Sequence, residues 1–326
     1  MRDVDALDRA RGPRASVAAM VLVTLPGQEW VDAVGPVPGL ELDVWDMSEP
    51  HPRAEEVRVV VPPYLGAGPR LPVLSTLPNL DLVQLLTAGY DGVPDVLPPG
   101  ARLANAAGVH DASTAELAVA LALASLRDVP DFVVAQREHR WLPTTMHPAL
   151  ADKRVLVVGY GAIGRAIAAR LTPFEVTVTA VASRARAGDD LVPSVHGVDE
   201  LPDLLPHHDV VILIVPLSEV TAGLVDDAFL SAMPDGSLLV NVARGGVVDT
   251  DALVRHARAG RIRAALDVTD PEPLPEDHPL WDLPGVLVTP HVGGASSAFT
   301  PRATRLLQEQ LGAYAAGRPL RNLVHP

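Results

Sequence analysis

Short apolar runs alternate with helical patterns along most of the chain, and this alternation predicts an α/β fold. In the first part, runs rich in β-branched residues are separated by turns rich in proline and glycine. The strands predicted there are 17–24, 40–45, 57–61, 82–86 and 103–105. A second, better defined series has predicted strands at 155–158, 176–181, 210–215, 237–242, 263–268 and 286–288. Strands that alternate with helices form parallel sheets covered by helices.

Two longer helices divide the predicted strands into domains. One is expected to begin near Ser113, because Ser113 and Glu116 have the spacing of a capping box before the apolar run 117–126. This role for Glu116 is preferred to a catalytic one. The other helix covers about 301–316, after which NLVHP is expected to return to the first lobe. We predict two doubly wound parallel-sheet, Rossmann-like lobes with an active-site cleft between them: a substrate-binding domain of residues 1–104 plus 296–326, and a dinucleotide-binding domain of residues 105–295.

The glycine-rich stretch 155–170, VLVVGYGAIGRAIAAR, joins a buried strand to a helix. In this G-x-G-x-x-G frame Gly159 permits a sharp turn, Gly161 leaves room for a pyrophosphate, and Gly164 lets the helix pack on the strand. The backbone N–H groups and the positive helix end then face an anion. The stretch predicts a dinucleotide site with Gly159, Tyr160, Gly161, Ala162, Ile163 and Gly164 along the cofactor.

Composition narrows the class of protein further. A net charge of -14 argues against a nucleic-acid surface, which needs basic patches. The absence of cysteine excludes disulfides and thiolate chemistry and is compatible with the cytoplasm, the compartment that we expect. No apolar run approaches the roughly 18 residues of a membrane span, and the run 17–25 fits a first strand better than a signal peptide. No spacing of His, Asp and Glu suggests a metal site.

Polar residues that could bind a ligand or take part in catalysis follow the strands of the second series. In open α/β sheets, ligands bind at this end of the strands. Arg244, in NVARGGVVD, can hold a carboxylate with two parallel hydrogen bonds, or it can cap nearby carbonyls as a surface arginine. His291, in VTPHVGG, can donate a proton to the alkoxide formed when a ketone accepts a hydride. Glu272 would favour the charged imidazolium if it reached His291, but it could equally be a solvated turn residue. Asp267 either orients the nicotinamide or caps a turn.

The region after the second strand of this series bears on the choice of cofactor. NAD enzymes usually carry an acid there, about twenty residues after the glycines, which binds the adenosine ribose. The residues found at this point are Ala182, Ser183, Arg184 and, shortly after, Arg186. The nearest acids, Asp189 and Asp190, come after the turn. A hydroxyl and two guanidiniums suit a 2′-phosphate, so NADP(H) is expected to be preferred, with NAD(H) possible; alternatively, the arginines only solvate a loop.

Together and in this order, the motifs resemble the D-isomer-specific 2-hydroxyacid dehydrogenase family, and glyoxylate/hydroxypyruvate reductases in particular. The segments that carry the resemblance are LLTAGYDGV, NAAG, TAELA, VLVVGYGAIG, IVPLSEVT, NVARGGVVD, ALDVTDPEPLP and TPHVGG. The resemblance implies that Arg244 binds the substrate carboxylate and polarises the keto group, that His291 is the acid/base, and that Glu272 is its partner. Backbone N–H groups of Ala88 and Gly89 would also bind the carboxylate.

The family pattern also assigns a cofactor path and an assembly. Residues expected along the cofactor are Val215, Pro216, Thr221, Ala243, Asp267, Gly293 and Gly294. The resemblance implies a homodimer formed through the cofactor domain, and Trp141 is either a core anchor or an aromatic at a subunit interface. This sequence departs from the pattern at Ala182, where an acid is usual, and at Thr269, where an aromatic is frequent.

The expected reaction is NAD(P)H-dependent reduction of a small 2-keto acid, of the glyoxylate or hydroxypyruvate type, to the D-2-hydroxy acid. Tyr64 and Leu65 are candidates for the residues that set pocket size, and their loop shows no arginine cluster for a phosphate. Two alternatives stay open. One is a dehydrogenase of the same fold that oxidises phosphite or formate, and the other is a protein that senses NAD(P)H without turnover.

Overall fold

The computed structural model describes residues 20–324, which form two compact units. The first comprises residues up to Leu86, Gly92–Asn105 and the chain from Thr304 onward; the second comprises Thr87–Asp91 and Ala106–Ala303. Residues 17–19 of the first predicted strand lie outside the described residues. The short segment Thr87–Asp91, expected in the substrate domain, belongs to the second unit, and the later division falls at Thr304 rather than at residue 296. Within residues 20–324, no helix is both long and apolar enough to cross a bilayer.

The first unit is built on a six-stranded sheet in the order β14-β5-β4-β3-β1-β2. All neighbours are parallel except β14, which runs antiparallel to β5. The strands are β1 (Val21–Leu25), β2 (Leu40–Val44), β3 (Val57–Val60), β4 (Leu82–Gln84), β5 (Arg102–Ala104) and β14 (Leu323–Val324). The helical segments are α1 (Gln28–Val34), η1 (Gly68–Thr76), η2 (Pro94–Val96) and most of α8 (Phe299–Ala315).

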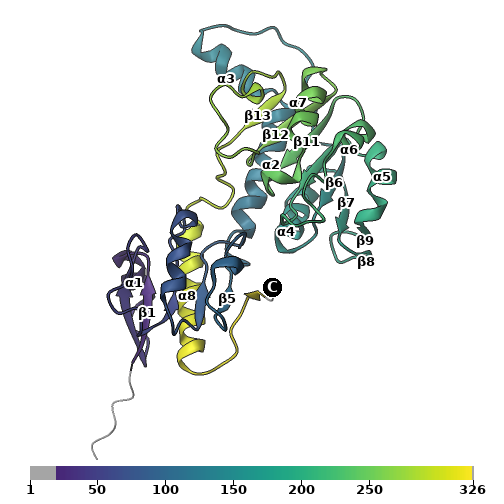
Figure 1. The fold of residues 1–326 in the computed structure, drawn as a ribbon. Coiled ribbons are helices and arrows are strands. Elements are labelled where there is room, and N and C mark those ends of the chain that lie inside the picture. The colour runs from purple at the N-terminus through teal and green to yellow at the C-terminus, as the bar shows by residue number, and fades with distance from the viewer. Residues whose placement is uncertain (1–19, 325–326) are drawn as a thin grey trace, which may run out of the picture. The chain divides into compact units, whose positions relative to one another are not determined.

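A buried pair of amides holds residues 321–324 in this unit. Gln310 of α8 donates from Nε2 to Gln84 Oε1 at 2.8 Å and to the carbonyl of Arg321 at 2.8 Å. In return, the Arg321 N–H donates to Gln310 Oε1 at 3.0 Å. These bonds lead residues 321–324 to the edge of β5, where β14 forms (Figure 1). The expected return of the last residues to the first lobe is thereby confirmed for the described part.

The second unit contains an eight-stranded sheet in the order β13-β12-β11-β10-β6-β7-β9-β8. Only β8 is antiparallel to its neighbour among the described strands of this sheet. The strands are β6 (Arg154–Val158), β7 (Thr177–Ala182), β8 (Arg186–Ala187), β9 (Ser194–Gly197), β10 (Val210–Leu213), β11 (Ser237–Asn241), β12 (Ile262–Leu266) and β13 (Val286–Val288). The α-helices are α2 (Asp111–Leu126), α3 (Val129–Arg137), α4 (Ala162–Leu171), α5 (Leu201–Leu204), α6 (Asp227–Ala232) and α7 (Thr250–Arg258). Short 3₁₀ turns are η3 (Thr172–Phe174), η4 (Val198–Glu200), η5 (Leu205–His207), η6 (Gly245–Val247) and η7 (Pro279–Trp281).

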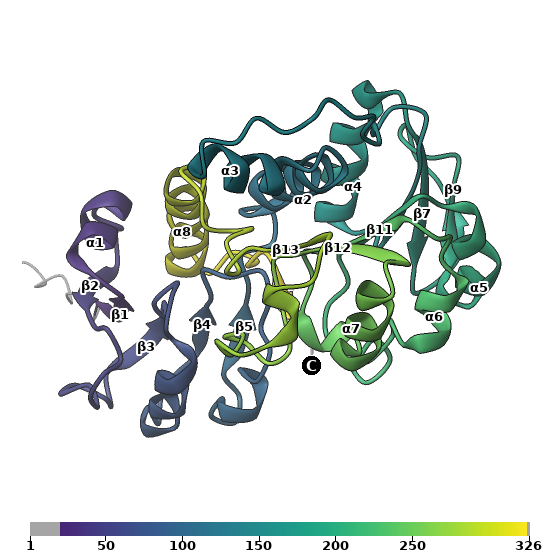
Figure 2. The same ribbon diagram turned by 90° about the horizontal axis from the view of Figure 1, so that it is seen from above.

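Unbroken apolar strands produce the two-sided burial of this sheet, because successive side chains point to opposite faces. Val155 and Val157 of β6 pack in one cluster with α2 and α4, whereas Leu156 and Val158 pack in the other with α6 and α7. Figure 2 shows α2 and α4 on one face of the sheet and α5, α6 and α7 on the other. The predicted α/β class, with helices on both faces of a parallel sheet, is confirmed.

One local prediction is wrong. Helix α2 begins at Asp111 with His110 as its N-cap, and no side chain caps its first turn. Ser113 therefore lies inside the helix, at a position that cannot act as the cap, and no capping box with Glu116 forms. Glu116 instead accepts a hydrogen bond from Arg170 of α4 at 3.3 Å.

Candidate active site

The turn between β6 and α4 is shaped by three glycines that do different things. Gly159 has a φ of 107°, and a Cβ there would collide with the carbonyl oxygen of Ile214. A Cβ on Gly164 would collide with the carbonyl of Gly159, so helix and strand pack closely only without it. Apart from its neighbours in the chain and helix, Gly161 has no heavy atom of the described residues within 4 Å of the position of a Cβ, so its surface is open. The turn thus fits a pyrophosphate that approaches backbone N–H groups at the N-terminus of α4.

Tyr160, between the first two glycines, turns its side chain into the protein. Only 7% of Tyr160 is exposed, and its hydroxyl donates to Asp189 Oδ1 at 3.0 Å. Burial and this carboxylate raise the pKa of Tyr160 to about 12. Asp189 also accepts from the Leu191 N–H at 2.9 Å and from Arg165 Nε at 2.8 Å. The Leu191 N–H foremost, together with Arg165 and Tyr160, lowers the pKa of Asp189 to about 2.

The residues predicted to bind a 2′-phosphate divide into two groups. Ser183 and Arg184 are exposed just after β7. Arg186, in β8, donates from Nη2 to the carbonyl of Tyr160 at 2.7 Å and lines a cavity of about 230 Å³ beside the glycine turn. The β8–β9 hairpin folds back toward the glycine turn. Asp189 therefore contacts Tyr160 of that turn, although the number of residues after the glycines suggested that it lies too far along the chain.

Arg244 follows β11 and is held by buried backbone contacts. Asn241, 1% exposed, accepts from the Ala243 N–H and donates to the Arg244 carbonyl, both at 3.0 Å. The guanidinium donates from Nη1 to the Ala243 carbonyl at 2.7 Å and from Nε to Asp91 Oδ2 at 3.1 Å. Its Nη2 lies so close to Gly89 that a Cβ on Gly89 would overlap it. The half-buried residues Ala88 and Gly89 are in the same segment, which the structure brings to Arg244 within the second unit.

His291 and Glu272 come together although 19 residues separate them. Nδ1 of His291 and Oε1 of Glu272 lie 2.7 Å apart, and both side chains remain partly exposed. Such a contact fixes the ring and leaves Nε2 directed elsewhere. Glu272 therefore reaches His291, and the role of His291 as the acid/base stays a prediction.

Asp267 fixes the loop that carries His291. Only 2% of Asp267 is exposed, and its carboxylate accepts from Thr289 Oγ1 at 2.6 Å and from the N–H groups of Val292 and Gly293 at 2.9 and 2.8 Å. Both carboxylate oxygens are thus used by the loop after β13. A contact between Asp267 and the nicotinamide stays a prediction, as does one for the half-buried Gly294.

The loop after β10 lies alongside the glycine turn. Its residue Ile214 donates its backbone N–H to the Val158 carbonyl at 2.8 Å, and Val215 and Pro216 follow directly. Thr221 closes the loop by donating from Oγ1 to the Pro216 carbonyl at 2.6 Å and accepting from the Ser218 N–H at 2.8 Å. The position of this loop is consistent with the predicted path of the cofactor.

A family model described as "D-isomer specific 2-hydroxyacid dehydrogenase, NAD binding domain" matches residues 119–293, more than half of the chain. The chain belongs to the D-isomer specific 2-hydroxyacid dehydrogenase family. Human glyoxylate reductase/hydroxypyruvate reductase is 30% identical over 299 residues, which cover 86% of this chain and 89% of the human protein.

Two solved structures extend the likeness to the fold of nearly the whole chain. A D-isomer specific 2-hydroxyacid dehydrogenase from Xanthobacter autotrophicus Py2, in complex with NADPH and MES, is 34% identical with a TM-score of 0.79 and covers 95% of this chain and 99% of that one. The NADPH-dependent glyoxylate/hydroxypyruvate reductase of Sinorhizobium meliloti, in complex with NADP and malonate, is 27% identical with a TM-score of 0.77 and covers 93% and 96%. The protein is thus a nicotinamide-dependent 2-hydroxyacid dehydrogenase, an oxidoreductase acting on CH–OH groups.

Two residues predicted to set the size of the dehydrogenase's substrate pocket belong to the first unit. Tyr64 is half-buried, and Leu65 is 72% exposed in the loop after β3. Their role stays a prediction. Sequence reasoning did not single out Asp91 or Arg165 as site residues. Asp91 lies in the motif LLTAGYDGV, and its charge is opposite to that of Arg244. Arg165 lies in the glycine-rich stretch 155–170, and its charge is opposite to that of Asp189 and Asp190. These opposite charges were the sequence features that could have indicated both residues.

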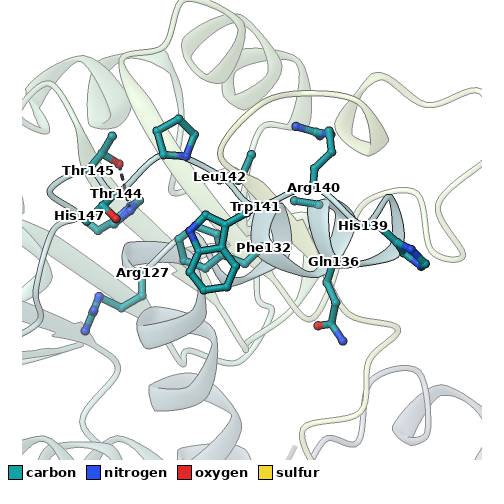
Figure 3. Close-up of a pocket in the computed structure, with 12 residues that line it drawn as sticks. Arg127, Phe132, Gln136, His139, Arg140, Trp141, Leu142, Thr144, Thr145 and His147 are labelled. Atoms are coloured by element: carbon teal, nitrogen blue, oxygen red, sulfur yellow. Dashed lines mark hydrogen bonds between the residues drawn. The ribbon is translucent and has the colours of Figure 1, made fainter.

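The dehydrogenase also carries an apolar arm, defined here as α3 and residues 138–147. Trp141 and Met146 are 96% and 98% exposed, so a core role for Trp141 is excluded. An open pocket of about 780 Å³ lies along the arm and is lined by Trp141, Phe132 and their neighbours (Figure 3). His147 Nδ1 lies 2.6 Å from Asp128 Oδ2, which ties the end of the arm to the start of α3.

Proposed function

We propose that this dehydrogenase reduces a small 2-keto acid, of the glyoxylate or hydroxypyruvate type, to the D-2-hydroxy acid. The observation that carries the proposal is the 2.7 Å contact between His291 Nδ1 and Glu272 Oε1. It provides a proton donor held by a carboxylate, which reduction of a ketone requires and cofactor binding alone does not. The names of the human and Sinorhizobium meliloti relatives support this substrate class.

Arg244 is proposed to bind the carboxylate of the keto acid and to polarise its keto group. Nε and one N–H of Nη1 are used by Asp91 and by the Ala243 carbonyl, so Nη2 and the other N–H of Nη1 remain to donate to the substrate. Nη2 lies beside Gly89. The N–H groups of Ala88 and Gly89 would then meet the same carboxylate from the other side, which fixes the orientation of a small acid.

His291 is proposed as the acid that completes the reaction. A nicotinamide cofactor, when bound, would supply the hydride for the keto carbon. Nδ1–H donated to Glu272 holds the ring and leaves Nε2 to carry the proton that passes to the keto oxygen. In the reverse direction, Nε2 accepts the hydroxyl proton. Asp267 keeps His291 in place through the Val292 and Gly293 N–H groups.

NADP(H) is proposed as the preferred cofactor. Ala182 stands where an acid would bind a ribose 2′-hydroxyl, and Ser183, Arg184 and Arg186 supply donors nearby. The two solved relatives contain NADPH or NADP. Dissociation constants measured by the fluorescence of the reduced nicotinamide should be lower for NADPH than for NADH. A lower dissociation constant for NADH would overturn this part.

We also propose that the chain forms a homodimer through the apolar arm. An indole that is 96% exposed and a methionine that is 98% exposed are disfavoured in water, and a second copy of this chain, paired through the cofactor domain, is the partner that the family resemblance implies. Sedimentation should report a dimer for the wild type and a monomer for Trp141→Ser combined with Met146→Ser. A monomeric wild type would refute the proposal.

The reaction is tested by following NADPH oxidation with a panel of 2-keto acids, with phosphite and formate tested as reductants of NADP⁺. Glyoxylate and hydroxypyruvate should be turned over, and Tyr64→Ala or Leu65→Ala should shift the preference toward longer keto acids. His291→Ala should abolish turnover but retain NADPH binding. Turnover of phosphite or formate without any 2-keto acid would refute the substrate class, and activity of His291→Ala would refute the role of His291.

A further inference from the structure

A second guanidinium lines the cavity beside the glycine turn. Arg165 is in the first turns of α4, where its N–H donates to the Gly161 carbonyl at 2.9 Å. Its side chain lines the same cavity of about 230 Å³ as Gly161 and Arg186. A water molecule occupies about 30 Å³ in the liquid. The cavity is several times larger, so it has room for a phosphate group and part of a ribose. Asp189 also lines the cavity, whereas Ser183, Arg184 and Asp190 do not.

Two aspartates neutralise Arg165, and their environments differ. Asp189 accepts from Arg165 Nε at 2.8 Å and is also bound by the Tyr160 hydroxyl and by the N–H groups of Leu191 and Val192. Asp190 binds Nη2 of Arg165, and its side chain is 73% exposed. Asp189 is therefore part of the local fold and sets the direction of the Arg165 fork. Asp190 is an exposed counterion that can move into water.

We infer that Arg165 belongs to the subsite for the 2′-phosphate of NADP(H), and that this phosphate replaces Asp190 as the partner of Arg165 Nη2. The inference rests on the proposed preference for NADP(H). A phosphate offers three acceptor oxygens and nearly two negative charges, so it outcompetes one exposed carboxylate for a guanidinium. Without phosphate, the charges of Arg165 and Arg186 are balanced by those of Asp189 and Asp190. The 2′-hydroxyl of NADH has no charge with which to displace Asp190.

The roles of the two groups predict opposite effects on binding. Arg165→Gln should weaken NADPH about tenfold or more, because a charge-assisted fork is lost, while NADH changes less than about twofold. Asp190→Asn should strengthen NADPH about threefold, because the phosphate no longer competes with a carboxylate, and should leave NADH unchanged. The matched control is Arg170→Gln. Arg170 is on the same helix, and its guanidinium binds Glu116 and the Ala166 carbonyl instead of lining the cavity.

Dissociation constants of NADPH and NADH, titrated by nicotinamide fluorescence without substrate, decide the matter independently of turnover. The inference is supported if the NADH to NADPH ratio of dissociation constants falls in Arg165→Gln, rises in Asp190→Asn and is unchanged in Arg170→Gln. Equal weakening of both cofactors by Arg165→Gln assigns Arg165 a structural role and overturns the inference. An unchanged NADPH constant in Asp190→Asn also overturns it, and a folding defect cannot mimic tighter binding. If the wild type prefers NADPH and Arg165→Gln keeps the full preference, only this inference is refuted. If the wild type prefers NADH, the proposed preference for NADP(H) is refuted as well.

Discussion

Gly89→Ala tests whether the Arg244 guanidinium must lie against the Thr87–Asp91 segment. An ideal Cβ on Gly89 would overlap Nη2 of Arg244, and would lie 3.0 Å from its Cζ and 3.1 Å from Asp91 Oδ2. The overlapping atom is the far end of a flexible side chain, and Gly89 does not have a left-handed backbone, so the backbone can stay in place. Arg244 must turn away, and the contact with Asp91 is lost.

The expected cost falls on catalysis and leaves folding nearly unchanged. An exposed ion pair such as that of Arg244 and Asp91 contributes about 0–1 kcal/mol to stability. Two charge-assisted hydrogen bonds to the keto acid contribute about 1.5–3 kcal/mol each, which gives roughly a 10²- to 10⁴-fold loss in kcat/KM. Steady-state kinetics with glyoxylate measure that loss, and thermal unfolding measures stability.

Gly246→Ala is the matched control for this experiment. A Cβ on Gly246 has its nearest neighbours at 3.5 Å on Leu217 and 3.7 Å on Asp270, which is ordinary contact. It should keep kcat/KM within about threefold, since no charge-assisted bond is lost. If Gly89→Ala behaves like this control, or if it loses NADPH binding and stability along with kcat/KM, the reasoning about Arg244 is refuted.

Three further predictions follow from buried or paired polar groups. Asp267→Asn should destabilise the fold by about 1–3 kcal/mol and lower kcat, because one of the N–H groups after His291 then faces an amide NH₂; urea unfolding and kinetics check this, and a wild-type midpoint would contradict it. Glu272→Gln should lower kcat about tenfold to a hundredfold and leave the NADPH dissociation constant unchanged; retention of full kcat would show that the pair is dispensable. Burial foremost lowers the pKa of His208 below 6.5. The folded state therefore binds this proton less tightly than the unfolded chain does. The contribution of His208 to stability is full above pH 6.5 and falls as the pH drops toward the lowered pKa. His208→Gln should therefore flatten the loss of unfolding free energy between about pH 7.5 and 5.5, and an equally steep loss in this variant would assign the acid sensitivity to other groups.

The parts of the fold that depend on local pattern could be predicted from the sequence. Strand β10, for example, was expected at 210–215 and spans Val210–Leu213, because an apolar run buried on both faces has a clear length and composition. The roles of Gly159 and Gly164 followed from the spacing of the motif. The start of α2 could not be predicted from the sequence, because His110 is its N-cap and makes no side-chain capping bond that a sequence pattern would indicate.

The contacts that complete the site depend on tertiary structure. Arg244 and Asp91 are 153 residues apart, and no periodicity relates them. The short β8–β9 hairpin was missed because β8 is exposed and has only two residues, so it lacks an apolar pattern. This hairpin brings Asp189 back to the glycine turn, and a count of residues after the glycines therefore misjudged where the nearest acid lies.

The buried amide pair that joins α8 to β4 has a consequence for synthesis on the ribosome. Asn105 and Asn322 are hydrogen-bonded although 217 residues separate them, so the first sheet gains β14 only after residues 106–303 have been translated. Residues 106–303 form an almost continuous unit that emerges before α8 is complete. Until then, the edge of β5 and the surface that later receives Gln310 remain uncovered in the nascent chain. Chaperone demand during production should therefore fall on the first unit, even though its strands β1 to β5 are made before the second sheet.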